Sequence, residues 1–164
     1  MSLRLHQDDP SDAIEATFFR VQRERMTDVP VMNPSLSVQA VGFQRWRGQW
    51  LGMIVTPWCM SLLLLPGSSD SWTSTNGNGR RFVEFPAGKF AFLGSFESDL
   101  GEFQSCSVFS PMNRFEDQSQ AVMTAQAFLL GLLAPTSPAG PGPARDSTPE
   151  DTISVSRRRF FSMR

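Results

Sequence analysis

The feature that most constrains this chain is a run of uncharged residues, 50–67, with the sequence WLGMIVTPWCMSLLLLPG. No charged residue lies between Arg47 and Asp70. Burial of apolar surface is favourable by roughly 25 cal/mol per Å², so this run must lie at the centre of the core. A membrane-spanning helix needs about 20 apolar residues and would be interrupted here by Pro57. The sequence therefore predicts a buried core segment and no stable membrane insertion.

The same run is predicted to form two strands, at residues 50–56 and 58–65. Proline fixes φ and lacks a backbone N–H, so we expect a bend or bulge at Pro57. Pro66 and Gly67 are typical of a turn and close the second strand.

Apolar residues recur every three or four positions in residues 11–26 and 117–133, which predicts two amphipathic helices. Shorter apolar or alternating runs predict further strands at 35–45, 82–85, 89–96 and 103–109. The expected fold is therefore α+β, with a central antiparallel sheet packed by an N-terminal and a C-terminal helix.

Three regions are expected along the chain. Residues 1–10 form a polar, flexible lead, and residues 11–134 form the folded domain. Residues 135–164 combine a Pro/Gly-rich linker with a basic tail, and a segment of that composition is expected to be disordered because it cannot build a core.

Composition excludes several function classes. The chain has 15 basic and 16 acidic residues, whereas nucleic-acid binders normally present a basic face. Its N-terminus lacks the apolar segment of an export signal, so the expected location is the cytoplasm. The two cysteines are too few for a disulfide framework or a zinc site. We expect no metal and no cofactor.

Residues suited to catalysis are scarce. His6 is the only histidine and lies in the lead, where an imidazole is not positioned for general-base chemistry. Cys59 lies in the buried run and is expected to pack as a small hydrophobe. Cys106 has polar neighbours and lies in the core or at its rim, and no local cation favours its thiolate. The sequence therefore predicts a protein that is not an enzyme.

Several short motifs together resemble the HybE/HoxT/HupJ family of [NiFe]-hydrogenase assembly chaperones. The resemblance covers roughly residues 13–133 and the tail. The motifs that carry it are Gly48-Gln49-Trp50, Thr56-Pro57-Trp58, Pro66-Gly67, Ser105-Cys106-Ser107 with Ser110-Pro111, and the terminal arginine run. Some relatives carry a rubredoxin-like module with CxxC pairs, which this chain lacks.

The resemblance implies a cytoplasmic, non-enzymatic chaperone. Its expected partner is the hydrogenase small subunit, whose twin-arginine signal peptide it would bind until the cofactors and the large subunit are in place. The large subunit and other accessory proteins are further candidate partners.

The hypothesised peptide site combines an apolar groove with an acidic turn. Carboxylates hold arginines best in bidentate pairs, so the acidic turn is expected to attract the twin arginines. The groove is assigned to Trp50, Trp58, Met60, Trp72, Cys106 and Phe109, and the turn to Glu97, Asp99 and Glu102.

Two further hypotheses stay open. The tail resembles the twin-arginine motif at Ser156, Arg157, Arg158, Phe160 and Phe161, so it is either a solvated basic tail or a mimic that occupies the groove. The alternative function is a redox or metal-handling protein that protects or delivers iron–sulfur components through Cys59 and Cys106. Two thiolates supply only half the ligands of a usual cluster, which weighs against this alternative.

Overall fold

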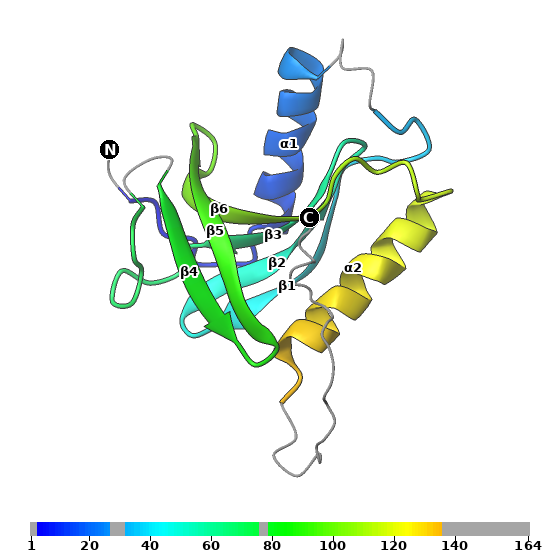
Figure 1. Ribbon diagram of the computed structural model, residues 1–164. Helices are drawn as coiled ribbons and strands as arrows, with labels where there is room; N and C mark the ends of the chain where they lie inside the picture. The colour runs from blue at the N-terminus through cyan, green and yellow to red at the C-terminus, as the bar shows by residue number, and fades with distance from the viewer. Residues whose placement is uncertain (1–2, 27–31, 76–78, 136–164) are drawn as a thin grey trace, which may run out of the picture.

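The uncharged run forms two adjacent inner strands of a six-stranded antiparallel sheet (Figure 1). The structure, a computed structural model, describes residues 3–26, 32–75 and 79–135. The strand order is β1-β2-β3-β6-β5-β4. The elements are α1 (Ser11–Arg25), β1 (Gln39–Trp46), β2 (Gln49–Val55), β3 (Met60–Leu65), β4 (Arg80–Phe85), β5 (Gly88–Glu97), β6 (Gly101–Phe109) and α2 (Gln118–Leu133). The predicted α+β fold is confirmed.

Strands β2 and β3 are buried on both faces of the sheet, which explains why their sequence is apolar without alternation. Leu62 and Leu64 of β3 point to one face, and Leu63 and Leu65 point to the other. Each face therefore has its own apolar cluster, and each cluster needs a cover.

Helix α2 covers one face and α1 covers part of the other (Figure 1). Ala125 and Leu129 of α2 join the cluster around Leu62, whereas Ile14 of α1 joins the cluster around Leu63. The Asp117 side chain caps α2 by accepting a hydrogen bond from the backbone N–H of Gln120 at 2.8 Å. The two predicted helices therefore lie on opposite sides of the sheet.

The turn between the two inner strands differs from its prediction. Val55 pairs with Met60, so residues 56–59 form a chain-reversing turn rather than a bend within continuing strands. The Thr56 hydroxyl organises this turn: it accepts hydrogen bonds from the backbone N–H groups of Trp58 and Cys59. Trp58 and Cys59 therefore leave the ladder and are presented at one end of the sheet.

Other boundaries differ by a few residues. The first strand begins at Gln39 rather than at residue 35, and the last begins at Gly101 rather than at residue 103. The described part of the lead also differs from expectation, because His6 is buried and its backbone N–H donates to the Pro66 carbonyl at 2.9 Å. The tail residues 156–161 lie outside the described residues.

Neither of the two helices is both long and apolar enough to cross a membrane within the described ranges. The uncharged run that raised this question is strand and turn.

Two glycines provide a matched test of the packing. A Cβ on Gly52 of β2 would lie 2.5 Å from the Phe43 ring, whereas a Cβ on Gly131 of α2 would meet nothing within 4 Å. Overpacking typically costs about 1–3 kcal/mol, and glycine in a helix interior costs about 0.5–1 kcal/mol relative to alanine. We predict that Gly52→Ala destabilises the protein and Gly131→Ala stabilises it in urea unfolding followed by circular dichroism. Equal effects of the two changes would contradict this packing.

Candidate functional site

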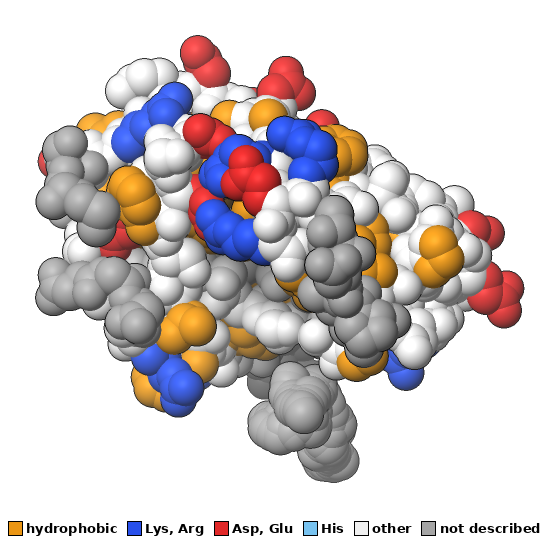
Figure 2. Space-filling model, turned by 90° about the horizontal axis from the view of Figure 1, so that it is seen from above, with side chains coloured by type: hydrophobic (Ala, Val, Ile, Leu, Met, Phe, Trp, Pro, Cys, Tyr) orange, Lys and Arg blue, Asp and Glu red, His pale blue; other side chains and the backbone are white. Residues whose placement is uncertain are grey.

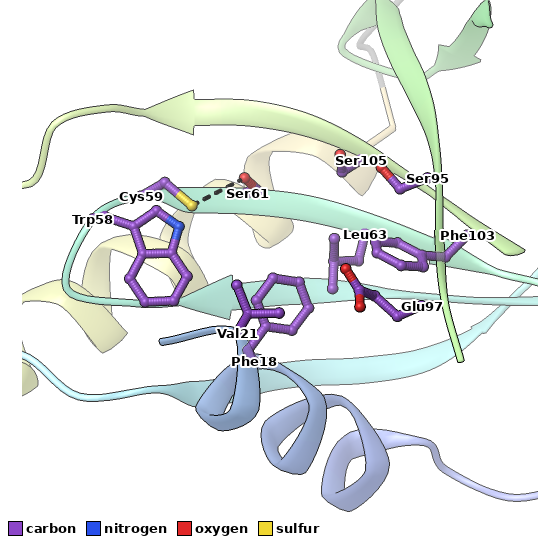
Figure 3. A pocket seen from close by; sticks show the side chains of 10 residues that line it. All are labelled: Phe18, Val21, Trp58, Cys59, Ser61, Leu63, Ser95, Glu97, Phe103 and Ser105. Atoms are coloured by element: carbon purple, nitrogen blue, oxygen red, sulfur yellow. Dashed lines mark hydrogen bonds between the residues drawn. The ribbon is translucent and has the colours of Figure 1, made fainter. Parts of the chain in front are cut away.

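A pocket of about 210 Å³ lies between α1 and the face of the sheet that α1 covers in part (Figure 3). Helix α1, the β2–β3 turn and strands β3, β5 and β6 each contribute to it. Its lining residues are Phe18, Val21, Trp58, Cys59, Ser61, Leu63, Ser95, Glu97, Phe103 and Ser105.

Strand alternation explains why the floor of the pocket is partly polar. Ser61 and Leu63 of β3 point to the same face, and Leu63 pairs with Ser105 of β6. In the view of Figure 3, Trp58 lies at one end of the pocket and Phe103 at the other, with Phe18 between them on the side of α1. The pocket thus offers apolar walls together with hydroxyl groups that can hydrogen bond to a ligand.

An ion-pair cluster joins α1 to the turn between β5 and β6. Arg25 contacts both carboxylate oxygens of Glu97, at 2.9 and 3.0 Å, which is a bidentate geometry. Arg20 contacts Glu97 at 2.9 Å and Asp99 at 2.9 Å. Figure 2, which views the molecule from above relative to Figure 1, shows basic and acidic side chains gathered near the middle of that surface. Because Glu97 also lines the pocket, the cluster lies at the pocket wall.

The arginines control the charge of this cluster. The hydrogen bond from Arg25 is the largest cause that lowers the pKa of Glu97, and burial opposes it. The hydrogen bonds that Arg20 donates to Glu97 and Asp99 raise the pKa of Arg20. Glu97 therefore stays ionised to a lower pH than an ordinary glutamate, and its ion pairs with the arginines persist with it.

The N-terminal lead supports the turn that carries Asp99. Arg4 donates to the Asp99 carbonyl at 2.6 Å, and the His6 ring lies 3.1 Å from the Leu100 carbonyl. Gly101 follows with φ of 80°, a conformation that favours glycine. Burial lowers the pKa of His6, so its ring is neutral at neutral pH. His6 thus has a structural role that the sequence did not indicate.

The structure brings only part of the hypothesised site together. Trp58 and Glu97 line the pocket. Asp99 does not line it, but Asp99 shares the ion-pair partner Arg20 with Glu97. Trp50 belongs to the same face but is buried, with its indole N–H donating to the His6 carbonyl at 2.8 Å.

The other hypothesised residues lie on the opposite face. Met60, Trp72, Cys106 and Phe109 belong to the α2-side cluster. Glu102 adjoins Phe103 on β6 and so points away from the pocket, where its carboxylate accepts from the Thr75 backbone N–H at 3.2 Å. The expectation of a single groove formed by all these side chains is therefore wrong, because neighbouring strand residues point to opposite faces.

Sequence reasoning missed the contribution of α1. Phe18 and Val21 line the pocket. Arg20 and Arg25 bind the carboxylates at its edge, Glu97 and Asp99, which we call the acidic rim. The helical spacing of the two apolar residues was a signal that this side of α1 faces the sheet. Nothing in the sequence indicated that a turn some 70 residues away would supply the carboxylates.

The two cysteines do not form one site. Cys59 lines the pocket, whereas Cys106 packs in the α2-side cluster on the other face. Burial raises the pKa of both thiols, that of Cys106 to about 11. Within the described ranges, no group of three or more His, Cys, Asp or Glu side chains is placed to hold a metal ion.

The sequence of this chain is similar to those of a known protein family. Residues 9–163 match the sequence profile of the family described as "[NiFe]-hydrogenase assembly, chaperone, HybE". The chain is 34% identical over 150 residues to the hydrogenase expression/formation protein HupJ of Bradyrhizobium diazoefficiens, a match that covers 92% of this chain and 85% of that protein.

Two further similarities differ in what they cover. The chain is 35% identical over 120 residues to the probable rubredoxin HupJ of Rhodobacter capsulatus, covering 73% of this chain but only 43% of that protein. The solution structure of HybE from Escherichia coli has a TM-score of 0.67 at 23% identity and covers 94% of this chain and 98% of that one. This last comparison concerns the fold alone.

The raised thiol pKa values give a pH-dependent prediction. With a pKa of about 11, Cys106 is only about 0.1% thiolate at pH 8, against roughly 10% for an unburied cysteine with a pKa of 9.0. We expect iodoacetamide to label the native protein slowly, with a rate that rises about tenfold per pH unit below the pKa. Labelling in guanidinium chloride is the control and should be fast. Equal labelling rates in the native and unfolded states would contradict the burial of both thiols.

Proposed function

Because this chain belongs to the HybE family of [NiFe]-hydrogenase assembly chaperones, we propose that it binds the twin-arginine signal peptide of a hydrogenase small subunit. Binding would delay export until cofactor assembly and subunit pairing are complete. The observation that supports this proposal best is an apolar pocket whose wall includes a carboxylate that already binds guanidinium groups. This is a holding function and involves no bond formation.

The pocket suits an apolar peptide segment. Phe18 and Trp58 are partly exposed aromatic side chains, and transfer of a partner's aliphatic side chains onto them is favourable. The hydroxyls of Ser61 and Ser105 can accept or donate hydrogen bonds without adding charge. The site therefore distinguishes an apolar segment from a charged one.

The acidic rim suits the arginine pair. Glu97 holds the Arg25 guanidinium with both oxygens, so this carboxylate has the geometry that a client arginine needs. Arg25 is the more exposed of its two partners, with 53% of the side chain accessible against 21% for Arg20. A client arginine would therefore replace Arg25 at Glu97.

Such an exchange keeps the number of ion pairs nearly constant. One guanidinium leaves the carboxylate and another takes its place, so the charge contact adds selectivity rather than affinity. Net binding free energy would then come mainly from the apolar segment. Lysine cannot reproduce the bidentate contact, which gives the proposed site a preference for arginine.

The alternative redox or metal-handling function has less support. Cys59 and Cys106 belong to opposite faces of the sheet, so they do not converge on one metal or cluster within this chain.

The first test of the proposal is a calorimetric titration with a small-subunit signal peptide. We expect binding that weakens when the two peptide arginines become lysines and when Glu97 becomes glutamine. Glu116→Gln is the matched control, because Glu116 is an exposed carboxylate beside the N-terminus of α2, which covers the opposite face of the sheet from the pocket. Absence of binding to the wild-type protein, or indifference to both arginine and Glu97 changes, would contradict the proposed function.

The arginine exchange has its own test. Arg25→Gln frees Glu97 from one competitor and should tighten peptide binding by up to about fivefold, the upper end of the effect of a single exposed ion pair. Arg23→Gln is the control, because Arg23 lies on the same helix, is exposed and makes no ion pair with any described residue. The gain should vanish for a peptide without arginines. Equal effects of the two substitutions would exclude competition at Glu97.

A further inference from the structure

Part of the pocket face of the sheet is left uncovered where β4 and β5 meet. Phe82 of β4 is 64% exposed and Leu93 of β5 is 48% exposed. Phe82 pairs directly with Ala91, which is also exposed. We call Phe82, Ala91 and Leu93 the β4–β5 strip.

The strip is continuous with the pocket. Glu97 and Ser95 line the pocket, and Leu93 and Ala91 follow at the same two-residue spacing along β5. Leu93 also pairs with Ser105, another lining residue, on the neighbouring strand. The acidic rim and the apolar strip are therefore two ends of one path along the sheet.

The chain's own helices leave this path open. Helix α1 packs mainly against β1, at the far edge of the sheet from β4, and α2 packs against β1 and β2 on the opposite face. The path thus has an acidic end that already binds arginine and an apolar strip that no described helix covers, with the exposed Arg80 directly opposite Leu93 on β4.

We propose that the β4–β5 strip binds the apolar segment that follows the arginine pair in the same client peptide. This inference rests on the proposed function and specifies where the rest of the peptide lies. The choice of occupant follows from continuity: Leu93 lies two residues along β5 from the lining residue Ser95, so a segment held at Glu97 by its arginines reaches the strip next. An apolar continuation matches the exposed Leu93 and Phe82 side chains.

The path also indicates the conformation of the bound segment. Strand β5 pairs with β4 over residues 88–93 and with β6 over residues 93–97. Backbone N–H and C=O groups point along the plane of a sheet, so the face of β5 presents side chains and no backbone partners to a peptide lying on it. A peptide lying on that face must satisfy its own N–H and C=O groups, which a helix does. We infer that the client segment binds as a helix.

The length of the path then limits the length of that helix. Glu97 and Ala91 are six residue steps apart along β5, which corresponds to about 20 Å. At about 1.5 Å per residue, a helix of roughly 13 residues spans this distance. A client apolar segment about half as long would reach the pocket but not the strip.

The test compares two faces of the same strand. We expect Leu93→Ser and Phe82→Ser each to weaken binding of a small-subunit signal peptide about tenfold, from the loss of buried apolar area. Phe96→Ser is the matched control, because Phe96 is 42% exposed on β5 but lies between Ser95 and Glu97 and points to the opposite face. Calorimetry gives the affinities, and circular dichroism melting confirms that each variant is folded.

A second peptide tests the length. Shortening its apolar segment to about six residues should weaken binding to the wild type and abolish the difference between the wild type and Leu93→Ser. Circular dichroism of the complex should show helix gained by the full-length peptide.

The outcomes separate this inference from the proposed function. Binding that responds to Glu97→Gln but not to Leu93→Ser or Phe82→Ser would overturn the strip and leave the signal-peptide site standing. No binding by the wild type would overturn both. Concentration-dependent dimerisation in sedimentation, lost in Leu93→Ser, would assign the strip to a second copy of the chain and overturn the inference.

Discussion

The structure depends on the burial of β2 and β3 from both sides. A strand that is apolar on both faces is stable only between two covers, so the sheet requires α2 on one face and α1 with the N-terminal lead on the other. The α2 face is closed by a continuous apolar cluster that reaches Phe85 and Phe92. The α1 face is closed over β1 to β3 and at Phe103 of β6, and the pocket lies at the border of that cover.

The ion pairs of α1 therefore have two consequences for one site. They attach the C-terminal half of the helix to the β5–β6 turn, and they occupy the carboxylates that the proposed client would need. Exposed ion pairs contribute little to stability because both partners are well solvated when apart. This weakness is what makes exchange with a client arginine feasible: Arg25 can leave Glu97 while Arg20, which also binds Asp99, holds the helix in place.

The fold could be predicted from the sequence to a large extent, whereas the site could be predicted only in part. Both helices and the two inner strands follow from local periodicity and from the uncharged run. Trp58, Glu97 and Asp99, which the structure places at or beside the pocket, were proposed because an aromatic beside a turn proline and an acidic turn are visible in the sequence. Met60 and Glu102 were assigned to the same groove wrongly, because the face to which a strand residue points depends on where the turn ends.

By itself, the sequence determined that residues 50–65 would be core and that the chain would be α+β, because burial and periodicity are properties of neighbouring residues. It also carried the motifs that identify the family. Only the tertiary structure decided that Arg20 and Arg25 meet Glu97, that the two cysteines lie on opposite faces, and that Phe82 and Leu93 remain uncovered. Those outcomes depend on strand order and on the placement of α1, which arise from contacts between residues far apart in the chain.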